Sequence, residues 1–321
     1  MNIFSKIEPY KLDYLTVDND HKLYIEQSGN PSGIPVLFLH GGPGAGTSSI
    51  YRRFFDPTKY RIILFDQRGS GKSSPYGSIN NNTSQKLIED IKNILDFLDI
   101  KKTIIYGGSW GSTLALLFSQ KYPSYVYSMV LRGVFLCRKS DIMWFYQRGA
   151  HEVFPDYWSD FISLIPTDER SDILSAYHKR IHGDDLELSK ELCKRWAIWE
   201  GRCSTLYPSD DVVNQFDECA LSLSKIETHF FQNDCFIEEN QIIKNIDVLK
   251  NIKCEIIHGR YDIVCPFKQA YDLHKVYINS KLHIIEDAGH SLLEPGITKK
   301  LLEIFNSCLL YTSPSPRDAT L

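Results

Sequence analysis

The stretch Gly107-Gly108-Ser109-Trp110-Gly111 decides the fold of this chain. It follows the apolar run 102–106 (KTIIY) and precedes a helix-like run at 112–120 (STLALLFSQ). Glycines on both sides of a serine, between a strand and a helix, indicate a turn too sharp for neighbouring side chains. We therefore expect the Ser109 hydroxyl to lie at the carboxyl end of the strand, with the Trp110 N–H beside it.

Short apolar segments on both sides of this turn predict alternating strands and helices. A helix is expected at 83–98, with Thr83 as its N-cap, because apolar residues recur there at helical spacing. Such alternation predicts an α/β fold with a mostly parallel sheet and helices on both faces. The other strands are expected at 22–26, 36–39, 61–66, 128–131, 254–258 and 281–285.

Between residues 135 and 244 the alternation stops, and helix formers and aromatic residues become frequent. This stretch predicts a helical cap inserted into an α/β core made of 1–134 and 245–307. The last segment, 308–321, abandons the preceding helical pattern and resembles translated sequencing-adaptor sequence. We expect that segment to be foreign to the protein and exclude it from the fold prediction.

Composition and charge limit the classes of function. The chain has 321 residues, of which 43% are hydrophobic, and a formal net charge of −4, which predicts neither nucleic acid nor an anionic membrane as a partner. No apolar run approaches the roughly 18 residues of a membrane span. The eight cysteines form no C-x-x-C pair and no export signal is evident, so we expect reduced thiols and a cytoplasmic protein. We expect no metal and no cofactor.

Two later strand ends carry the residue types that a serine nucleophile needs. Asp262 follows the strand at 254–258, and His290 follows the strand at 281–285. Because the carboxyl ends of parallel strands meet at one edge of a sheet, Ser109, Asp262 and His290 are expected to converge. Ser109 would attack a carbonyl, His290 would transfer the proton, and Asp262 would hold the imidazole. The alternative is that Asp262 caps a helix and His290 is bonded within a loop.

A glycine-rich loop, His40-Gly41-Gly42-Pro43-Gly44, follows the strand at 36–39. Such a loop can donate a backbone N–H to an oxyanion, together with the N–H of Trp110. We expect Gly42 to be this donor, with Gly41 as the alternative. A phosphate-binding loop is disfavoured because the lysine and hydroxyl pair of a P-loop is missing.

Seven motifs, in this order, resemble those of the proline iminopeptidases, a family of serine peptidases with the α/β-hydrolase fold. The resemblance extends from about residue 8 to 305. It implies release of N-terminal proline from peptides through an acyl-enzyme, without metal. The motifs lie at 40–44 (HGGPG), 66–73 (DQRGSGKS), 107–114 (GGSWGSTL), 131–135 (LRGVF), 196–200 (WAIWE), 258–262 (HGRYD) and 288–291 (AGHS), the last followed by Glu294-Pro295.

The resemblance also implies a role for two glutamates of the cap. A free N-terminal amine needs a carboxylate near the nucleophile, and Glu200 and Glu227 match the glutamates that the family uses for the imino group. The family's usual E-N-H-Y-F at this point is E-T-H-F-F here, so that Thr228 and Phe230 depart from it. The alternative is that both glutamates are solvated residues on helix surfaces.

A prolyl ring needs a small apolar pocket, for which Phe135, Trp144, Phe145, Tyr146 and Phe236 are candidates. The family often has a tyrosine where Phe145 stands. Core packing is the alternative for each aromatic residue. Arg132 is a further substrate-binding candidate that could pair with a carboxylate of the cap, or form a plain structural ion pair.

Two other functions compete with an exopeptidase that cleaves after N-terminal proline. One is a carboxylesterase or amidase on the same fold, which would have no use for an amine-binding pair such as Glu200 and Glu227. The other is a non-catalytic ligand-binding protein, which would have no need to keep both a triad and an oxyanion loop. The oligomeric state is not predicted.

Overall fold

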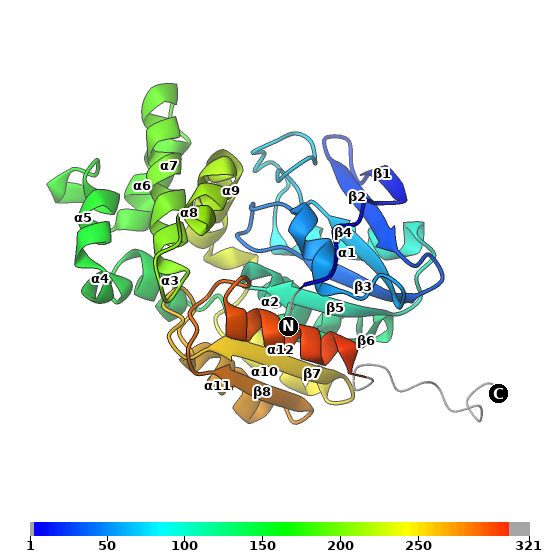
Figure 1. Cartoon of the computed structure of the whole chain (residues 1–321). Helices are drawn as coiled ribbons and strands as arrows, with labels where there is room; N and C mark the ends of the chain where they lie inside the picture. The colour runs from blue at the N-terminus through cyan, green and yellow to red at the C-terminus, as the bar shows by residue number, and fades with distance from the viewer. Residues whose placement is uncertain (1–2, 308–321) are drawn as a thin grey trace.

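The computed structural model describes residues 3–307, in which eight strands form one sheet (Figure 1). The strand order is β1-β2-β4-β3-β5-β6-β7-β8. The β1–β2 and β2–β4 pairs are antiparallel, and all other neighbours in the sheet are parallel. The strands are β1 (Lys11–Thr16), β2 (Lys22–Gly29), β3 (Ile34–Leu39), β4 (Tyr60–Phe65), β5 (Thr103–Gly108), β6 (Val126–Arg132), β7 (Lys253–Gly259) and β8 (Ser280–Ile285).

Helices cover both faces of the sheet because its central strands are apolar on both sides. All six residues of β5 are buried. Ile105 packs in the cluster that includes the apolar faces of α1, α2 and α11, whereas Ile104 and Tyr106 pack in the cluster on the α12 side. Burial on both faces is what the continuous apolar runs of the sequence predict. These helices are α1 (Ser84–Phe97), α2 (Trp110–Lys121), α11 (Lys268–Val276) and α12 (Pro295–Asn306).

A block of helices is inserted between β6 and β7 and lies to one side of the sheet in Figure 1. It occupies the stretch in which the sequence loses its strand–helix alternation. Its core is aromatic: Trp196 stacks on Tyr146 with ring centroids 4.1 Å apart, and Phe161 stacks on Tyr177 at 4.6 Å. Its helices are α3 (Lys139–Tyr146), α4 (Ala150–Val153), α5 (Pro155–Ile162), α6 (Ile173–Ile181), α7 (Leu186–Cys203), α8 (Asp210–Glu218) and α9 (Ala220–Gln232). The last helix before β7, α10 (Gln241–Lys244), lies apart from this block and contacts α2.

The predicted fold class is confirmed, and the strands expected from the sequence are present with small changes at their ends. Thr83 caps α1 as expected, since its Oγ1 accepts the N–H of Lys86 at 3.3 Å. The edge strand β1 has no counterpart in the prediction, because none of its side chains is buried. No helix of the described residues is long and apolar enough to span a membrane. The expected foreign segment, 308–321, lies outside the described residues.

Candidate active site

Ser109 lies at the turn between β5 and α2 in a conformation that L-residues rarely adopt, with φ +56° and ψ −127°. Such backbone costs about 1–3 kcal/mol and persists only when neighbours hold it. Here the Ser109 N–H donates to the Arg132 carbonyl at 2.9 Å, and the Ser109 carbonyl accepts the Ser112 hydroxyl at 2.7 Å. A Cβ at Gly107 or Gly111 would overlap backbone atoms of adjacent segments, which explains both glycines.

Asp262 and His290 come from the loops after β7 and β8 and meet as the strand order predicts. His290 Nδ1 lies 2.7 Å from Asp262 Oδ2, and both residues are buried. The other carboxylate oxygen, Oδ1, accepts the N–H of Cys265 at 2.8 Å. Burial raises the pKa of Asp262, but the charge and hydrogen bond of His290 outweigh it and hold that pKa below its ordinary value. The alternative, in which His290 is bonded only within its own loop, is wrong.

The space for the His290 ring depends on Gly133, which the sequence did not single out for this purpose. Gly133 follows β6 with φ +53°, and a Cβ on it would lie 2.8 Å from His290 Cε1 and 2.9 Å from Nδ1. Any larger residue would therefore displace the imidazole.

A second buried histidine, His258 at the end of β7, connects the segment after β6 to the loop after β7 that carries Asp262. Its Nδ1 accepts the N–H of Val134 at 3.1 Å, and its Nε2–H donates to the carbonyl of Cys265 at 2.7 Å. Burial lowers the pKa of His258, so the neutral ring with one donor and one acceptor is favoured. Its Nε2 also lies 3.3 Å from Asp262 Oδ2.

The glycine-rich loop lies against the nucleophile. A Cβ on Gly41 would lie 3.4 Å from Ser109 Cβ, and Gly42 lines both cavities that Ser109 lines. Trp110 is the first residue of α2, so its N–H is one of the four that a helix leaves without an intrahelical partner. Gly42, in the loop after β3, and Trp110, at the start of α2, are thus both near Ser109.

A small cavity extends from Ser109 into the helical block. Phe135, Phe145 and Tyr146 line it as expected, but Trp144 and Phe236 do not. The Trp144 indole N–H donates to the Ile263 carbonyl at 2.8 Å, and Phe236 packs on His229 and Phe230, with ring centroids 5.1 and 5.3 Å away. The predictions for Trp144 and Phe236 are therefore wrong. The lining residues are Gly42, Ser109, Phe135, Asp141, Ile142, Phe145, Tyr146, Glu200, Glu227, Phe231, Val264 and Cys265.

Glu200 and Glu227 both lie in this cavity, 4% and 1% exposed, so the alternative of solvated helix residues is wrong. Glu227 Oε2 accepts the indole N–H of Trp196 at 2.6 Å and the Tyr146 hydroxyl at 3.4 Å. Glu200 Oε2 is buried and has no hydrogen-bond partner among the described residues. Two buried carboxyl groups with an unpartnered acceptor oxygen can pair with a cation.

Burial sets the protonation of this pair. It raises the pKa of Glu200 to about 7. For Glu227, burial and then the charge of Glu200 raise the pKa well above its ordinary value. The pair therefore holds at least one proton near neutral pH in the absence of a cation. A cationic ligand would favour the ionised forms.

Arg132 does not form the ion pair with the cap that the sequence allowed. Among the described residues its guanidinium forms no salt bridge, and its Nη1 donates to the backbone carbonyl of His290 at 2.7 Å. Arg132 lines a second cavity, together with Ser109 and His290. No pattern in the sequence could have indicated a backbone carbonyl 158 residues away as its partner.

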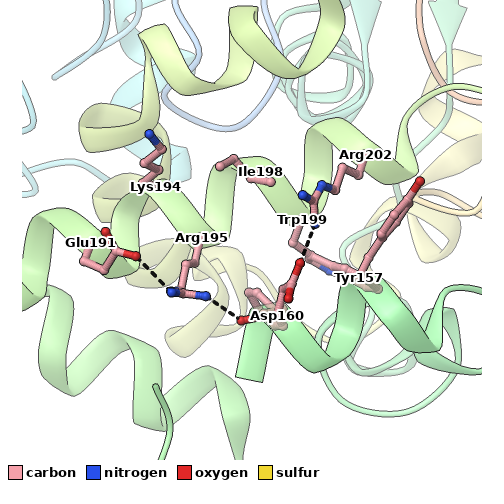
Figure 2. Close-up of a pocket in the computed structure, with 9 residues that line it drawn as sticks. Tyr157, Asp160, Glu191, Lys194, Arg195, Ile198, Trp199 and Arg202 are labelled. Atoms are coloured by element: carbon pink, nitrogen blue, oxygen red, sulfur yellow. Dashed lines mark hydrogen bonds and ion pairs between the residues drawn. The ribbon is translucent and has the colours of Figure 1, made fainter. Parts of the chain in front are cut away.

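The helical block also has a surface groove of about 360 Å³ between α5 and α7. Figure 2 shows that charged residues lining the groove form ion pairs with one another: Arg202 contacts Asp160 at 2.8 Å, and Arg195 contacts Glu191 at 3.0 Å. None of Ser109, Asp262 and His290 lines this groove. No group of three or more His, Cys, Asp or Glu side chains suited to a metal ion is found among the described residues.

Comparison with known proteins places the chain in a family. The model of the alpha/beta hydrolase fold matches residues 34–296. A proline iminopeptidase of Arabidopsis thaliana is 46% identical, over 94% of this chain and 80% of the relative. The chain belongs to the proline iminopeptidases. A probable proline iminopeptidase of Leptolyngbya boryana is 45% identical, over 94% and 95% of the two chains.

Solved structures agree on the fold of this proline iminopeptidase family member. A bromoperoxidase from Bacillus anthracis has a TM-score of 0.65 at 19% identity and covers 94% of this chain and 98% of its own. An esterase from Exiguobacterium antarcticum has a TM-score of 0.61 at 21% identity, with 92% and 99% covered. At these identities the likeness concerns the fold alone.

Proposed function

We propose that this protein is a serine aminopeptidase that releases N-terminal proline from peptides. The observation that carries the proposal is that Ser109 and the two buried glutamates, Glu200 and Glu227, line one small apolar cavity. The curated relatives at 45–46% identity are named for the same activity.

In this proposal, the proline ring lies among Phe135, Phe145 and Phe231, and its ammonium binds between Glu200 and Glu227. The chemistry of the lining, aromatic side chains beside two buried carboxyl groups, supports a first residue with an apolar ring and a cationic nitrogen. The free volume of the cavity is about 20 Å³, so the ring enters as lining side chains move apart. A blocked amine would place an uncharged amide against two carboxyl groups, so the site should require a free N-terminus.

The proposed chemical step uses Ser109, His290 and Asp262 as nucleophile, base and orienting carboxylate. Ser109 Oγ attacks the prolyl carbonyl while His290 accepts its proton, and Asp262 holds the imidazolium through Nδ1. The N–H groups of Gly42 and Trp110 stabilise the oxyanion of the tetrahedral intermediate. His290 gives the proton to the leaving amine as the peptide bond breaks. Water then attacks the prolyl-enzyme ester while His290 accepts a proton from it, and His290 returns that proton to Ser109 Oγ as the ester bond breaks and proline leaves.

We further propose that residues 135–244 act as the cap that closes the site, on a core formed by 1–134 and 245–307. The cap supplies both glutamates and most of the aromatic lining, which supports this division. The seven cysteines among the described residues are free thiols, which supports a reducing compartment such as the cytoplasm.

The test compares hydrolysis of prolyl 4-nitroanilide, alanyl 4-nitroanilide and 4-nitrophenyl acetate. We expect the proline substrate to give the highest kcat/KM and Ser109→Ala to abolish its turnover. Preference for the ester would instead favour the carboxylesterase alternative. Turnover that persists in Ser109→Ala would contradict the mechanism.

A further inference from the structure

A second cavity, of about 100 Å³, adjoins the first at Gly42, Ser109 and Glu200. It includes His290, which the first cavity does not, and it lacks Glu227. With a proline ring in the first cavity and its carbonyl carbon at Ser109, the next residue of the peptide has its Cα about 3.8 Å from that of proline. The second cavity is therefore where the next residue would lie.

The lining of this cavity is mostly apolar. It comes from the 3₁₀ segment Ser49–Phe54, from α8 and α9, and from the loop after His290. Glu200 and Arg132 are its charged members, and Arg132 already donates to the His290 carbonyl. The larger apolar and aromatic side chains are Tyr51, Val212, Phe216, Leu223, Leu292 and Leu293.

We propose that this cavity binds the residue that follows proline and selects an apolar side chain there. The inference rests on the proposed function, because it assumes cleavage at Ser109. An apolar side chain would leave water on binding, whereas an aspartate would bring a second negative charge close to Glu200. Differences of one methylene in an apolar site change kcat/KM by about 10- to 200-fold.

The first experiment measures kcat/KM for Pro-Leu, Pro-Gly and Pro-Asp, with prolinamide as a reference that lacks a second residue. We expect Pro-Leu to exceed Pro-Gly by at least about tenfold, and Pro-Asp to be the poorest. Equal values, or preference for Pro-Asp, would overturn the inference. Failure to cleave prolinamide and all dipeptides would instead contradict the proposed function.

A variant locates the preference in the cavity. Phe216→Ala should lower the ratio of kcat/KM for Pro-Leu to that for Pro-Gly about fivefold or more, by removing apolar contact area. Phe97→Ala, at an exposed phenylalanine of α1 outside both cavities, is the matched control and should leave the ratio unchanged. Leu293→Ala provides a second test of the same wall. An unchanged ratio in both cavity variants would overturn the assignment.

An independent observation concerns Gln67, a buried glutamine after β4 that connects the two segments of the proposed oxyanion hole. Its Oε1 accepts the indole N–H of Trp110 at 2.9 Å, and its Nε2 donates to the carbonyl of His40 at 2.9 Å. His40 directly precedes the glycine-rich loop. One planar amide therefore fixes the distance between the turn at Ser109 and that loop.

The His40 ring also connects the Gln67 backbone to the glycine-rich loop. Its Nε2 accepts the Gln67 N–H at 3.0 Å, so Nδ1 carries the proton and donates to the Gly41 carbonyl at 2.9 Å. Burial lowers the pKa of His40, which favours this neutral form. The peptide between Gly41 and Gly42 is thus oriented through its carbonyl.

We infer that Gln67 is a positioning residue for the oxyanion hole. It contacts no reacting atom, and it acts by holding the Gly42 and Trp110 N–H groups in one fixed relation. The inference rests on the proposed function, since it concerns the rate of that reaction. Loss of one oxyanion donor typically lowers kcat about 100- to 1000-fold, so partial misplacement should lower it by at least about tenfold.

The test uses Gln67→Leu and Gln67→Glu, with Gln120→Leu as the matched control. Gln120 is a part-buried glutamine of α2 that bonds the Ile242 carbonyl and lines neither cavity. We expect both Gln67 variants to lower kcat for prolyl 4-nitroanilide at least tenfold with KM within about threefold. The glutamate variant keeps an acceptor for Trp110 but loses the donor to His40, so it should not restore the rate.

A transition-state analogue separates positioning from a merely structural role. The inhibition constant of a prolyl boronic acid, which forms a tetrahedral adduct with serine, should rise in parallel with the loss of kcat. Inhibition by free proline should not change. If folded Gln67 variants keep kcat within twofold, or if boronate and proline inhibition weaken equally, the inference is wrong. Should Gln67→Leu fail to fold, Gln67→Glu alone decides. An inactive parent enzyme would instead contradict the proposed function.

Discussion

Three residues of this site have a backbone conformation or surroundings that are unfavourable for the same residue in an unfolded chain. Ser109 has a positive φ, and Glu200 and Glu227 are carboxyl groups without solvent. These features cost stability in the free enzyme, and a bound ammonium would offset part of that cost by pairing with the carboxylates. Substitution of these residues should therefore change the free energy of unfolding as well as the activity.

Glu200→Gln should change the pH dependence of stability. Burial raises the pKa of Glu200 from an ordinary 4.5 to about 7. A carboxyl with a raised pKa contributes stability below pH 4.5 that is lost as pH rises through 7. Glutamine cannot ionise, so we expect the variant to gain on the order of 3 kcal/mol relative to wild type between pH 5 and pH 8.

Chemical denaturation of both proteins at the two pH values measures this difference. Glu218→Gln, at an exposed glutamate of α8, serves as the control and should show no such gain. A Glu200→Gln variant with the same stability deficit or gain at pH 5 and pH 8 would contradict the protonation assigned to the pair.

Gly133→Ala should displace the catalytic imidazole. The added Cβ would lie 2.8 Å from His290 Cε1, so the ring must shift. A displacement of about 1 Å in a catalytic group can lower kcat about 100-fold. Gly77→Ala is the control, because Gly77 also has a positive φ of +70° but its nearest neighbour would be 3.7 Å away. Steady-state kinetics check this, and equal kcat values for the two variants would contradict it.

Among the secondary-structure elements, the helical block and the loop of His290 are joined directly. The N–H groups of His290 and Ser291 donate to the Ser204 carbonyl at 2.9 and 2.7 Å, just beyond the end of α7, which carries Glu200. The same short segment therefore positions both Glu200 and His290. The ends of β6 and β7 are joined by His258.

His258→Leu should weaken the link between β6 and β7. It leaves the Val134 N–H and the Cys265 carbonyl buried without their partner, at about 1–3 kcal/mol each. We expect the free energy of unfolding to fall by about 2–5 kcal/mol. In His274→Leu, where a part-exposed ring loses one bond to Ser280, the loss should stay below about 1 kcal/mol. Urea denaturation tests this, and equal losses in the two variants would contradict it.

Over the whole molecule, local patterns predicted the order of strands and helices and the loops that carry Ser109, Asp262 and His290. These elements and loops could be predicted from the sequence because each of the three side chains follows an apolar strand, and parallel strands bring their carboxyl ends together. Contacts between distant segments could not be predicted in this way. His258 bonds a backbone N–H 124 residues away, and the Gln67 amide bonds a tryptophan 43 residues away.

The aromatic residues of the cavity next to Ser109 could likewise be predicted only in part from the sequence. Phe231 lines the cavity four residues after Glu227 on α9, a spacing that places both on one helix face and could have indicated it. Phe236 follows the end of that helix, where Cys235 has φ +52°, so helical spacing no longer predicts its direction. Tertiary packing, and not composition, decided which aromatic side chains face Ser109.

Hydrolysis of prolyl 4-nitroanilide and of its N-acetylated form tests the proposed aminopeptidase activity most directly. We expect the free amine to be hydrolysed at least about 1000-fold faster in kcat/KM, because the acetyl group removes the charge that we propose Glu200 and Glu227 bind. In Glu200→Gln the two substrates should become much closer in kcat/KM. Similar hydrolysis of both substrates by the wild-type enzyme would contradict the assignment of an aminopeptidase.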